Sequence, residues 1–146
     1  MHCRDVMLPY VYKSYETDSV HLCARKMLEE NVGFLPVVDQ HEKLIGVITD
    51  RDLTIRVLAE NRPGSTQVGT VMTTGELLTC RPEDDLKPVE ERMMEAKKMR
   101  VPVVDDLGEC IGIISLSDIA QSERSWRTAH LLREISWRAS EPPIKR

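Results

Sequence analysis

Hydrophobic and polar positions along the chain predict the same order of elements in both halves. Apolar residues recur at helical spacing in each half, at Val20, Cys23, Met27 and Leu28 and again at Leu86, Val89, Met93 and Met94. A strand-like segment precedes each helix ("YVYKSY" and "ELLTCR"), and two apolar segments with a polar, hairpin-sized connector follow it. Because a second helical segment closes each half ("RDLTIRVLAENR" and "SDIAQSERSW"), the pattern predicts βαββα twice.

The chain is an internal duplication. With a shift of 66 residues, "PVVD" at 36–39 falls on "PVVD" at 102–105, and "IGVIT" falls on "IGIIS". Nearer the start the shift is 65, and "DVM" at 5–7 falls on "TVM" at 70–72. Agreement in several short motifs indicates a repeat. A unit of ~60 residues is marginally stable alone, so we expect the two units to pack with pseudo-twofold symmetry.

The repeat predicts four segments: a first unit at 1–62, a linker at 63–69, a second unit at 70–121 and a helical tail with a frayed end at 122–146. Leu131, Leu132 and Ile135 give the tail one apolar stripe. The tail holds 6 basic and 3 acidic residues, whereas the rest of the chain holds 14 basic and 21 acidic residues. It could pack on the acidic body or its dimer mate, dock another protein, or lie on a membrane surface.

Composition narrows the class of protein. The hydrophobic content of 41% can fill a core, and the net charge of −4 argues against general nucleic-acid binding. No apolar run approaches the ~20 residues that cross a bilayer, and the start has no signal-type apolar segment. We therefore expect a soluble, cytoplasmic protein without a nucleic-acid or membrane partner.

Neither metal nor catalytic chemistry is indicated. Cys3, Cys23, Cys80 and Cys110 form no CxxC pair, so ordinary thiols in a reducing compartment are expected and no metal site. No nucleophile elbow, zincin or P-loop motif is present, which predicts a protein that is not an enzyme and needs no cofactor.

Polar residues at the predicted helix starts have a structural interpretation. Asp18 and the run Glu83–Asp85 can cap the free amides of the first helix in each half. Thr49 with Asp52, and Ser115 with Asp118, have the three-residue spacing of a capping box.

The same spacing also has a functional interpretation. A helix start with a hydroxyl can face a phosphate, and an aspartate one turn later can accept hydrogen bonds from ribose hydroxyls. Gly46 and Gly112 would let another group approach the strand closely. "VGFLPV" and "KMRVPV" offer an apolar wall for a flat base. The residues alone leave both interpretations open.

The two motif sets, "PVVD…GVITDRDL" and "PVVDDLGECIGIISLSD", resemble tandem CBS (cystathionine-beta-synthase) domains, which form a Bateman module. The resemblance covers roughly residues 1–121. It implies an α+β (α/β-like) fold of two βαββα units, here with an added C-terminal helix. It also implies clefts between the units that bind adenosine-containing ligands, and homodimers shaped as a flat disk.

The resemblance also implies roles for individual residues. Asp52 and Asp118 would hold the ribose, whereas Thr49, Arg51 and Ser115 would face the phosphates. The base would lie against Gly33, Phe34, Leu35 and Pro36 in the first repeat and against Arg100, Val101 and Pro102 in the second.

The two repeats depart from the family pattern in different ways. Thr79 fits a threonine common in the first strand, but the first repeat has Lys13 there, which would either reach a phosphate or partly block the cleft. Leu116 and Ser117 stand where the first repeat has charged residues, so Arg100 would have to meet a phosphate. We therefore expect the first site to suit a charged nucleotide better.

The resulting hypothesis is a regulatory CBS-pair protein that senses AMP, ADP or ATP and signals through a change of conformation or partner, with the tail as a contact for another protein. S-adenosylmethionine or a dinucleotide also fits the pattern. The alternative is a nucleotide-independent adaptor, or a regulatory subunit of another protein, in which the T/S-x-x-D motifs are only helix caps.

Overall fold

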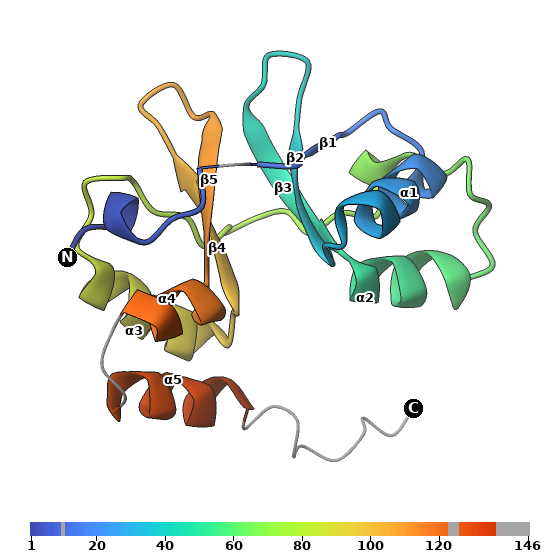
Figure 1. The fold of residues 1–146 in the computed structure, drawn as a ribbon. Coiled ribbons are helices and arrows are strands. Elements are labelled where there is room, and N and C mark those ends of the chain that lie inside the picture. Colours follow the sequence, from blue (N-terminus) through green and yellow to red (C-terminus); the bar gives the residue numbers. More distant parts are fainter. Residues whose placement is uncertain (10, 123–125, 137–146) are drawn as a thin grey trace. The chain divides into compact units, whose positions relative to one another are not determined.

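A computed structural model describes residues 1–9, 11–122 and 126–136. It divides into two compact units (Figure 1). The first-repeat unit contains Val11–Leu77 and Asp106–Cys110, and the second-repeat unit contains Met1–Tyr10, Leu78–Asp105 and Ile111–Arg146. Each repeat therefore gives a short segment to the unit that is built mainly from the other repeat.

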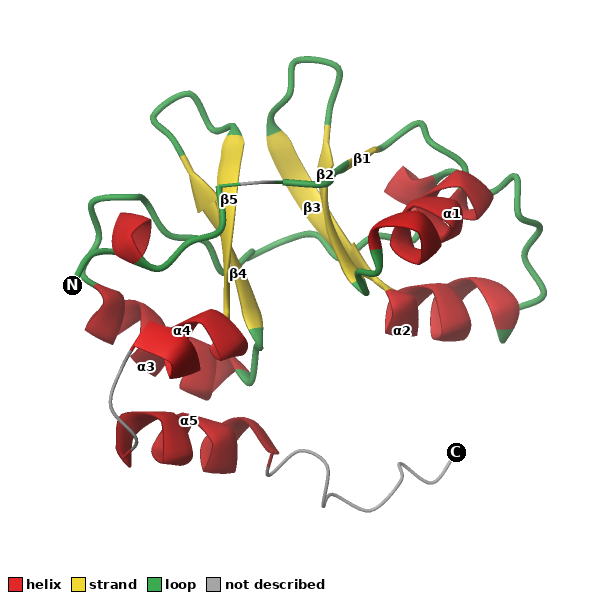
Figure 2. Ribbon diagram, in the orientation of Figure 1, coloured by secondary structure: helices red, strands yellow, loops and turns green. Residues whose placement is uncertain are grey.

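The first-repeat unit contains a three-stranded sheet in the order β1 (Ser14–Tyr15), β2 (Phe34–Val38), β3 (Leu44–Thr49). β1 is parallel to β2, and β2 is antiparallel to β3. Helix α1 (Val20–Glu30) precedes β2, whereas α2 (Asp50–Asp52) follows β3 and continues as a π-helix, Leu53–Leu58 (Figure 2). The core joins helix and strand side chains: Val20, Cys23, Met27, Leu35, Val37, Ile48, Val57, Val68 and Val71.

The second-repeat unit follows the same plan. Helix α3 (Leu86–Ala96) is followed by β4 (Arg100–Val104), β5 (Cys110–Ser115) and α4 (Leu116–Ser122), and α5 (Trp126–Ser136) is added after the repeat. β4 and β5 form a two-stranded sheet. The predicted α+β class with a C-terminal helix is confirmed.

The first strand of each repeat is shorter than the sequence pattern indicated. β1 has two residues, and its counterpart is a single parallel bridge between Cys80 and Val103. In the first repeat the Asp18 carboxylate accepts a hydrogen bond from the Tyr15 amide at 2.9 Å and turns the chain. In the second, Pro82 has no amide hydrogen to extend the pairing.

The predicted cap of the first helix is wrong by one residue. Ser19 caps α1, because its hydroxyl accepts a hydrogen bond from the Leu22 amide at 3.0 Å. Asp18 instead closes the preceding turn, and Asp84 does the same in the second repeat by accepting from the Arg81 amide at 2.8 Å. When a carboxylate accepts a hydrogen bond from the amide three residues before it, the carboxylate points away from the helix that follows and cannot cap it.

The apolar faces of the long helices are confirmed except at one position. Val20, Cys23 and Met27 are buried, but Leu28 is 69% exposed. Its counterpart Met94 is partly buried against the core cluster to which Leu131 and Ile135 of α5 belong. Among the described residues, no equivalent helix covers Leu28.

The tail helix packs on its own unit. Leu131 is 1% exposed and Ile135 is 7% exposed, and both lie in the core cluster of the second-repeat unit, whereas Leu132 is 46% exposed. In Figure 1, α5 runs alongside α3 and α4. The frayed end predicted for the tail lies outside the described residues.

Candidate functional site

The first corner is the Thr49–Asp52 segment, where β3 ends and α2 begins. Thr49 has extended backbone angles, and its hydroxyl accepts a hydrogen bond from the Asp52 amide at 3.1 Å. In return, Oδ2 of Asp52 accepts from the Thr49 amide at 3.0 Å. The capping box predicted by the structural interpretation is therefore present.

The second corner, Ser115–Asp118, repeats this arrangement between β5 and α4. Oδ2 of Asp118 accepts from the Ser115 amide at 2.7 Å and from the Ser115 hydroxyl at 2.6 Å. The Asp118 amide lies 3.2 Å from the same hydroxyl oxygen, which accepts its hydrogen bond. At each corner the cap uses only Oδ2 of the aspartate, so Oδ1 takes no part in the capping box.

The other carboxylate oxygen differs between the two corners. Oδ1 of Asp52 lies 3.7 Å from Nε of Arg56, whose Nη1 donates to the Val71 carbonyl at 2.9 Å. In the second repeat Ser122 stands in place of Arg56 and donates to the Ile119 carbonyl instead. Among the described residues, the hydrogen bonds of the Asp118 carboxylate all fall on Oδ2. Within the described part of the chain, Oδ1 of Asp118 therefore has no partner, whereas Oδ1 of Asp52 has a cation beside it.

Strand pairing brings the predicted base wall of the first repeat to its corner. Phe34 is the register partner of Thr49, and the Gly33 carbonyl accepts from the Asp50 amide at 3.0 Å. Gly33 is closely covered, because a Cβ there would lie 2.7 Å from Oδ2 of Asp50. Leu35 and Pro36 are buried, which leaves partly exposed Phe34 as the side chain of this wall beside the corner.

The second repeat places its candidates in a comparable way. The Leu116 amide donates to the Met99 carbonyl at 2.9 Å, which holds the start of β4 beside the second corner. Arg100 is exposed, whereas Val101 and Pro102 are buried. Thr79 is partly buried and precedes Cys80, whose amide donates to the Pro102 carbonyl at 3.1 Å.

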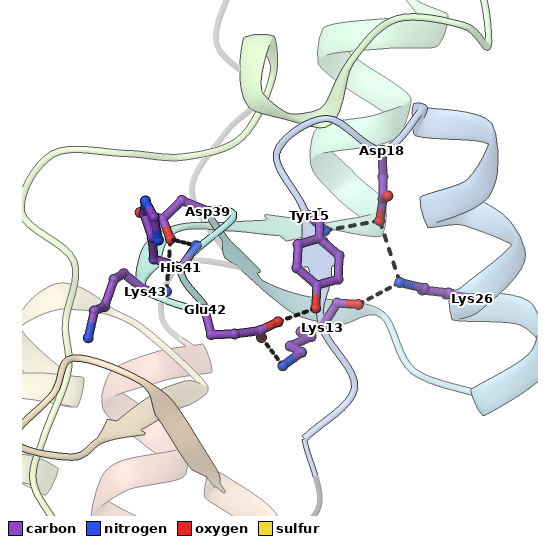
Figure 3. Close-up of polar contacts among 8 residues, drawn as sticks. All are labelled: Lys13, Tyr15, Asp18, Lys26, Asp39, His41, Glu42 and Lys43. Atoms are coloured by element: carbon purple, nitrogen blue, oxygen red, sulfur yellow. Dashed lines mark hydrogen bonds and ion pairs between the residues drawn. The ribbon is translucent and has the colours of Figure 1, made fainter.

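Lys13 is held by the β2–β3 hairpin. Figure 3 shows its ammonium group paired with the Glu42 carboxylate, whose other oxygen accepts from the Tyr15 hydroxyl. The contact with Glu42 raises the pKa of Lys13, and contacts with Lys13 and then Tyr15 lower the pKa of Glu42. The lysine therefore already has a partner, and a ligand phosphate would compete with Glu42 for it.

The two strand glycines face the chain itself. A Cβ at Gly46 would lie 2.6 Å from Sδ of Met72, and one at Gly112 would lie 2.8 Å from Sδ of Met7. The interpretation of these glycines as room for a ligand is therefore corrected. They admit the methionines of the matched "DVM" and "TVM" segments, which the sequence could not show because the contacts join distant positions.

Two residues that contact predicted site residues were missed from the sequence. Arg56 could have been found from its spacing, since it lies four residues after Asp52 on one helical face. It also lines a pocket of about 250 Å³ with Thr70–Met72. Glu42 gave no local signal, because its contact with Lys13 depends on the pairing of β1 with β2.

A metal site is not evident among the described residues, which contain no cluster of three or more histidine, cysteine or acidic side chains able to hold an ion. Within the same residues, no helix is both long and apolar enough to cross a membrane.

Comparison with known proteins places the chain in a family. The CBS domain model matches twice, at residues 3–59 and 68–124, and the chain belongs to the CBS domain family. The CBS domain-containing protein YhcV of Bacillus subtilis (strain 168) is 34% identical over 126 residues, covering 86% of this chain and 88% of the relative.

Solved structures of CBS domain proteins also match the fold of this chain. The CBS domain pair of protein MJ0100, in complex with 5-methylthioadenosine and S-adenosyl-L-methionine, matches with a TM-score of 0.74 and 27% identity, over 84% of this chain and 94% of the other. CBSX2 in complex with AMP matches with a TM-score of 0.72 and 27% identity, over 83% and 94%.

Proposed function

We propose that this CBS domain pair is a regulatory, non-catalytic protein that binds an adenosine-containing ligand at its two corners. The pairing of Phe34 with Thr49 carries the proposal, because it sets an aromatic side chain beside a cap hydroxyl and the Asp52 carboxylate. A base and a ribose require an apolar surface and a polar acceptor next to each other. The 27% identical relatives in complex with AMP and with S-adenosyl-L-methionine support this ligand class.

The first corner suits a charged nucleotide such as AMP, ADP or ATP. Asp52 accepts hydrogen bonds from the ribose, and Thr49 and Arg51 face the phosphates. Arg51 is exposed, and its guanidinium makes no hydrogen bond or ion pair with the described residues. Arg56 places a second positive charge beside Asp52. Guanidinium groups bind phosphate through paired charge-assisted hydrogen bonds, so both arginines favour an anionic ligand.

The second corner suits a ligand with less negative charge. Asp118 has an oxygen not used by its cap, which is available to a ribose hydroxyl. Ser117 and Ser122 stand where the first repeat has Arg51 and Arg56, so a phosphate here relies on Arg100. S-adenosylmethionine or a dinucleotide remains compatible with this corner.

Signalling would follow from a population shift. A ligand that binds one conformation of the pair more tightly than another biases the equilibrium by that difference in affinity. Helix α5, which packs on the second-repeat unit, would transmit the change to a partner or to a second copy of the chain.

A structural observation also favours the alternative, a nucleotide-independent adaptor. The capping boxes satisfy the amides at both corners, and Glu42 already pairs with Lys13. Under this alternative, loss of an aspartate changes stability and nothing else.

A thermal-shift panel separates the two functions. AMP, ADP, ATP, S-adenosylmethionine and a GTP control would be added to the wild type, Asp52→Asn and Asp118→Asn. Asparagine keeps an oxygen for the cap but removes the charge that a ribose hydroxyl binds. A ligand at about 100 times its dissociation constant should stabilise by roughly 2.7 kcal/mol, a shift of roughly 5–10 °C. We expect about a tenfold loss of affinity at the altered corner.

Asp5→Asn is the matched control. Oδ2 of Asp5 accepts from the His2 amide at 2.8 Å with the same three-residue spacing, but it belongs to neither corner. This variant should bind the ligand as the wild type does. No shift with any adenosine ligand would reject the proposal in favour of the adaptor, whereas equal shifts in all four proteins would reject the two corner aspartates as ligand contacts.

A further inference from the structure

Two residues of the first repeat differ from their counterparts in the second, and the two differences meet in space. With the shift of 66 residues, Lys13 falls on Thr79 and Glu42 falls on Gly108. Figure 3 shows the Lys13 ammonium group paired with the Glu42 carboxylate. The second repeat has neither the cation nor the carboxylate at these positions, so the contact is specific to the first repeat.

Glu42 adopts a backbone conformation that a glycine adopts in the second repeat. Its φ is 62°, and the φ of Gly108 is 80°. The Glu42 amide donates to the Asp39 carbonyl at 3.1 Å, which places the residue in the turn between β2 and β3. The left-handed region disfavours residues with a Cβ, and among them asparagine, aspartate and histidine are the enriched types. The turn therefore gives no reason for a glutamate, and the reason lies in the contacts of its carboxylate.

Lys13 and Tyr15 present two hydrogen-bond donors to this carboxylate. They flank Ser14, which is 0% exposed, so the alternation of side chains along the strand sets both on the face opposite to Ser14. The Lys13 ammonium donates to Oε2 of Glu42, and the Tyr15 hydroxyl donates to Oε1. The hydrogen bond to Glu42 also raises the pKa of Tyr15, which keeps the hydroxyl protonated. An ammonium and a hydroxyl that bind two oxygens of a carboxylate can bind two oxygens of a phosphate in the same way.

Contacts that do not involve Glu42 hold the two donors in place. The Lys13 carbonyl accepts from Nζ of Lys26 at 2.8 Å, and the Tyr15 amide donates to the Asp18 carboxylate at 2.9 Å. The Lys13 ammonium lies 5.8 Å from the centre of the Tyr15 ring, within the range of a cation–π contact. The backbone and the ring would therefore keep the donors together when the Glu42 carboxylate leaves them.

The contact is open to solvent. The Lys13 side chain is 37% exposed and the Glu42 side chain is 38% exposed, so a small anion can reach the ammonium group. A partly exposed ion pair contributes only a modest free energy, because water screens the two charges. An anion in solution can therefore compete with Glu42, and its binding needs only a rotation of the Glu42 side chain.

We propose that Lys13 and Tyr15 form a binding site for a phosphate group, and that Glu42 is a built-in competitor that occupies the site until a phosphate displaces it. The phosphate is either free or part of a nucleotide. In the second case the inference rests on the proposed function, and Glu42 then sets how strongly the protein responds to the phosphates of its ligand.

Competition by Glu42 weakens phosphate binding by a defined factor. The apparent dissociation constant equals the intrinsic constant divided by the fraction of molecules in which the site is open. If Glu42 leaves the site open in about one molecule in ten, its removal lowers the apparent dissociation constant roughly tenfold. The gain requires Lys13, because that residue supplies the positive charge for which Glu42 and the phosphate compete.

Titration calorimetry of the full chain with pyrophosphate, ADP and adenosine tests the proposal. Glu42→Gly introduces the residue of the second repeat, and the double variant Lys13→Thr with Glu42→Gly introduces both. We expect Glu42→Gly to bind ADP, pyrophosphate or both roughly tenfold more tightly than the wild type, and the double variant to lose this gain. Adenosine has no phosphate, so Glu42→Gly should not change its affinity. A gain with pyrophosphate identifies free phosphate as sufficient, whereas a gain with ADP alone shows that the rest of the nucleotide is needed.

Glu29→Gln is the matched control, because it removes one negative charge from the same unit and should bind each ligand as the wild type does. A gain that persists in the double variant, an equal gain for adenosine, or no gain with either phosphate compound would each overturn the proposal. If ADP and adenosine bind to none of the proteins but pyrophosphate shows the gain, the adenosine ligand is rejected and this site is supported. Glycine suits the positive φ of the turn, and a melting curve of each variant verifies that it folds.

Discussion

At the scale of single residues, the aspartate of each corner uses one carboxylate oxygen for a helix cap, and its other oxygen could accept a hydrogen bond from a ligand. Oδ2 of each carboxylate closes a capping box, and in the second repeat it also accepts from the Ser115 hydroxyl. Arg56 stands beside Oδ1 of Asp52 at 3.7 Å, whereas Ser122 occupies the matching position in the second repeat, and no ion pair of Asp118 is found within the described part of the chain. The residue four positions along the helix thus adds to the electrostatic difference between two motifs that share the same hydroxyl–aspartate spacing.

The Lys13–Glu42 contact predicts a pH-dependent stability. Because the pKa of Glu42 is lowered in the folded protein, its contribution is complete above the pKa of a free glutamate, about 4.3. It is lost as pH falls through the lower pKa of the folded state. We expect Glu42→Gln to reduce the free energy of unfolding at pH 7, with the difference from wild type shrinking below about pH 5. Urea unfolding across this range measures it.

Glu29→Gln is the control for that series. Glu29 pairs with Arg25 at 3.1 Å on the surface of α1, and both side chains are more than half exposed. An exposed pair of this kind contributes little, so the variant should follow the wild type at each pH. A difference between Glu42→Gln and wild type that does not change with pH would contradict the electrostatic interpretation.

At the scale of elements, the helices that follow the two corners differ. After Asp52 the chain forms π-type hydrogen bonds, with the Ala59 amide donating to the Thr54 carbonyl and the Arg62 amide to the Val57 carbonyl, both at 2.9 Å. The second repeat has an ordinary α-helix, α4, in the same place. Wider turns change where side chains point, and here Arg56 reaches both Asp52 and the Val71 carbonyl.

Helix α5 is an element of the second-repeat core, which predicts a contrast between two adjacent leucines. Leu131→Ala should cost about 2–4 kcal/mol, because Leu131 is 1% exposed and its removal leaves a cavity. Leu132→Ala should change the free energy of unfolding by less than about 0.5 kcal/mol, since that side chain is 46% exposed. Chemical denaturation of both variants checks this, and equal costs would mean that α5 does not pack as described.

At the scale of the whole molecule, the start of each repeat packs in the unit that is built mainly from the other repeat. The start of the first repeat supplies Met7 to Gly112, and the start of the second repeat supplies Met72 to Gly46. Each unit is therefore completed by residues that are distant in sequence from most of its core.

These contacts predict the effect of a single methyl group. Gly46→Ala should destabilise the protein by about 1–3 kcal/mol, because the new Cβ meets Sδ of Met72 at 2.6 Å and the Thr73 carbonyl oxygen at 2.8 Å. Gly64→Ala is the control, since its Cβ would make only an ordinary 3.4 Å contact with His21. Thermal unfolding of the two variants distinguishes them, and similar melting temperatures would refute the close approach at Gly46.

Sequence patterns were sufficient where the determining interactions are local. Helical spacing identified the buried faces of α1 and α3, and the three-residue spacing of Thr49 with Asp52 identified a capping box. Prediction was less accurate at Leu28 and Asp18. Burial at Leu28 depends on whether another helix covers it. The Asp18 carboxylate could accept either from the helix start or from the preceding turn, and in the structure it accepts from the Tyr15 amide of the turn.

What the sequence determined by itself was the duplication, the order of elements, the CBS resemblance and the residues that could form two corners. Tertiary structure alone decided which groups distant in sequence meet. Glu42 holds Lys13, Arg56 reaches the Val71 carbonyl, and two methionines cover the strand glycines. The physical reason is range: spacing along the chain fixes contacts within one turn or strand, whereas strand pairing and burial bring together groups that no local pattern connects.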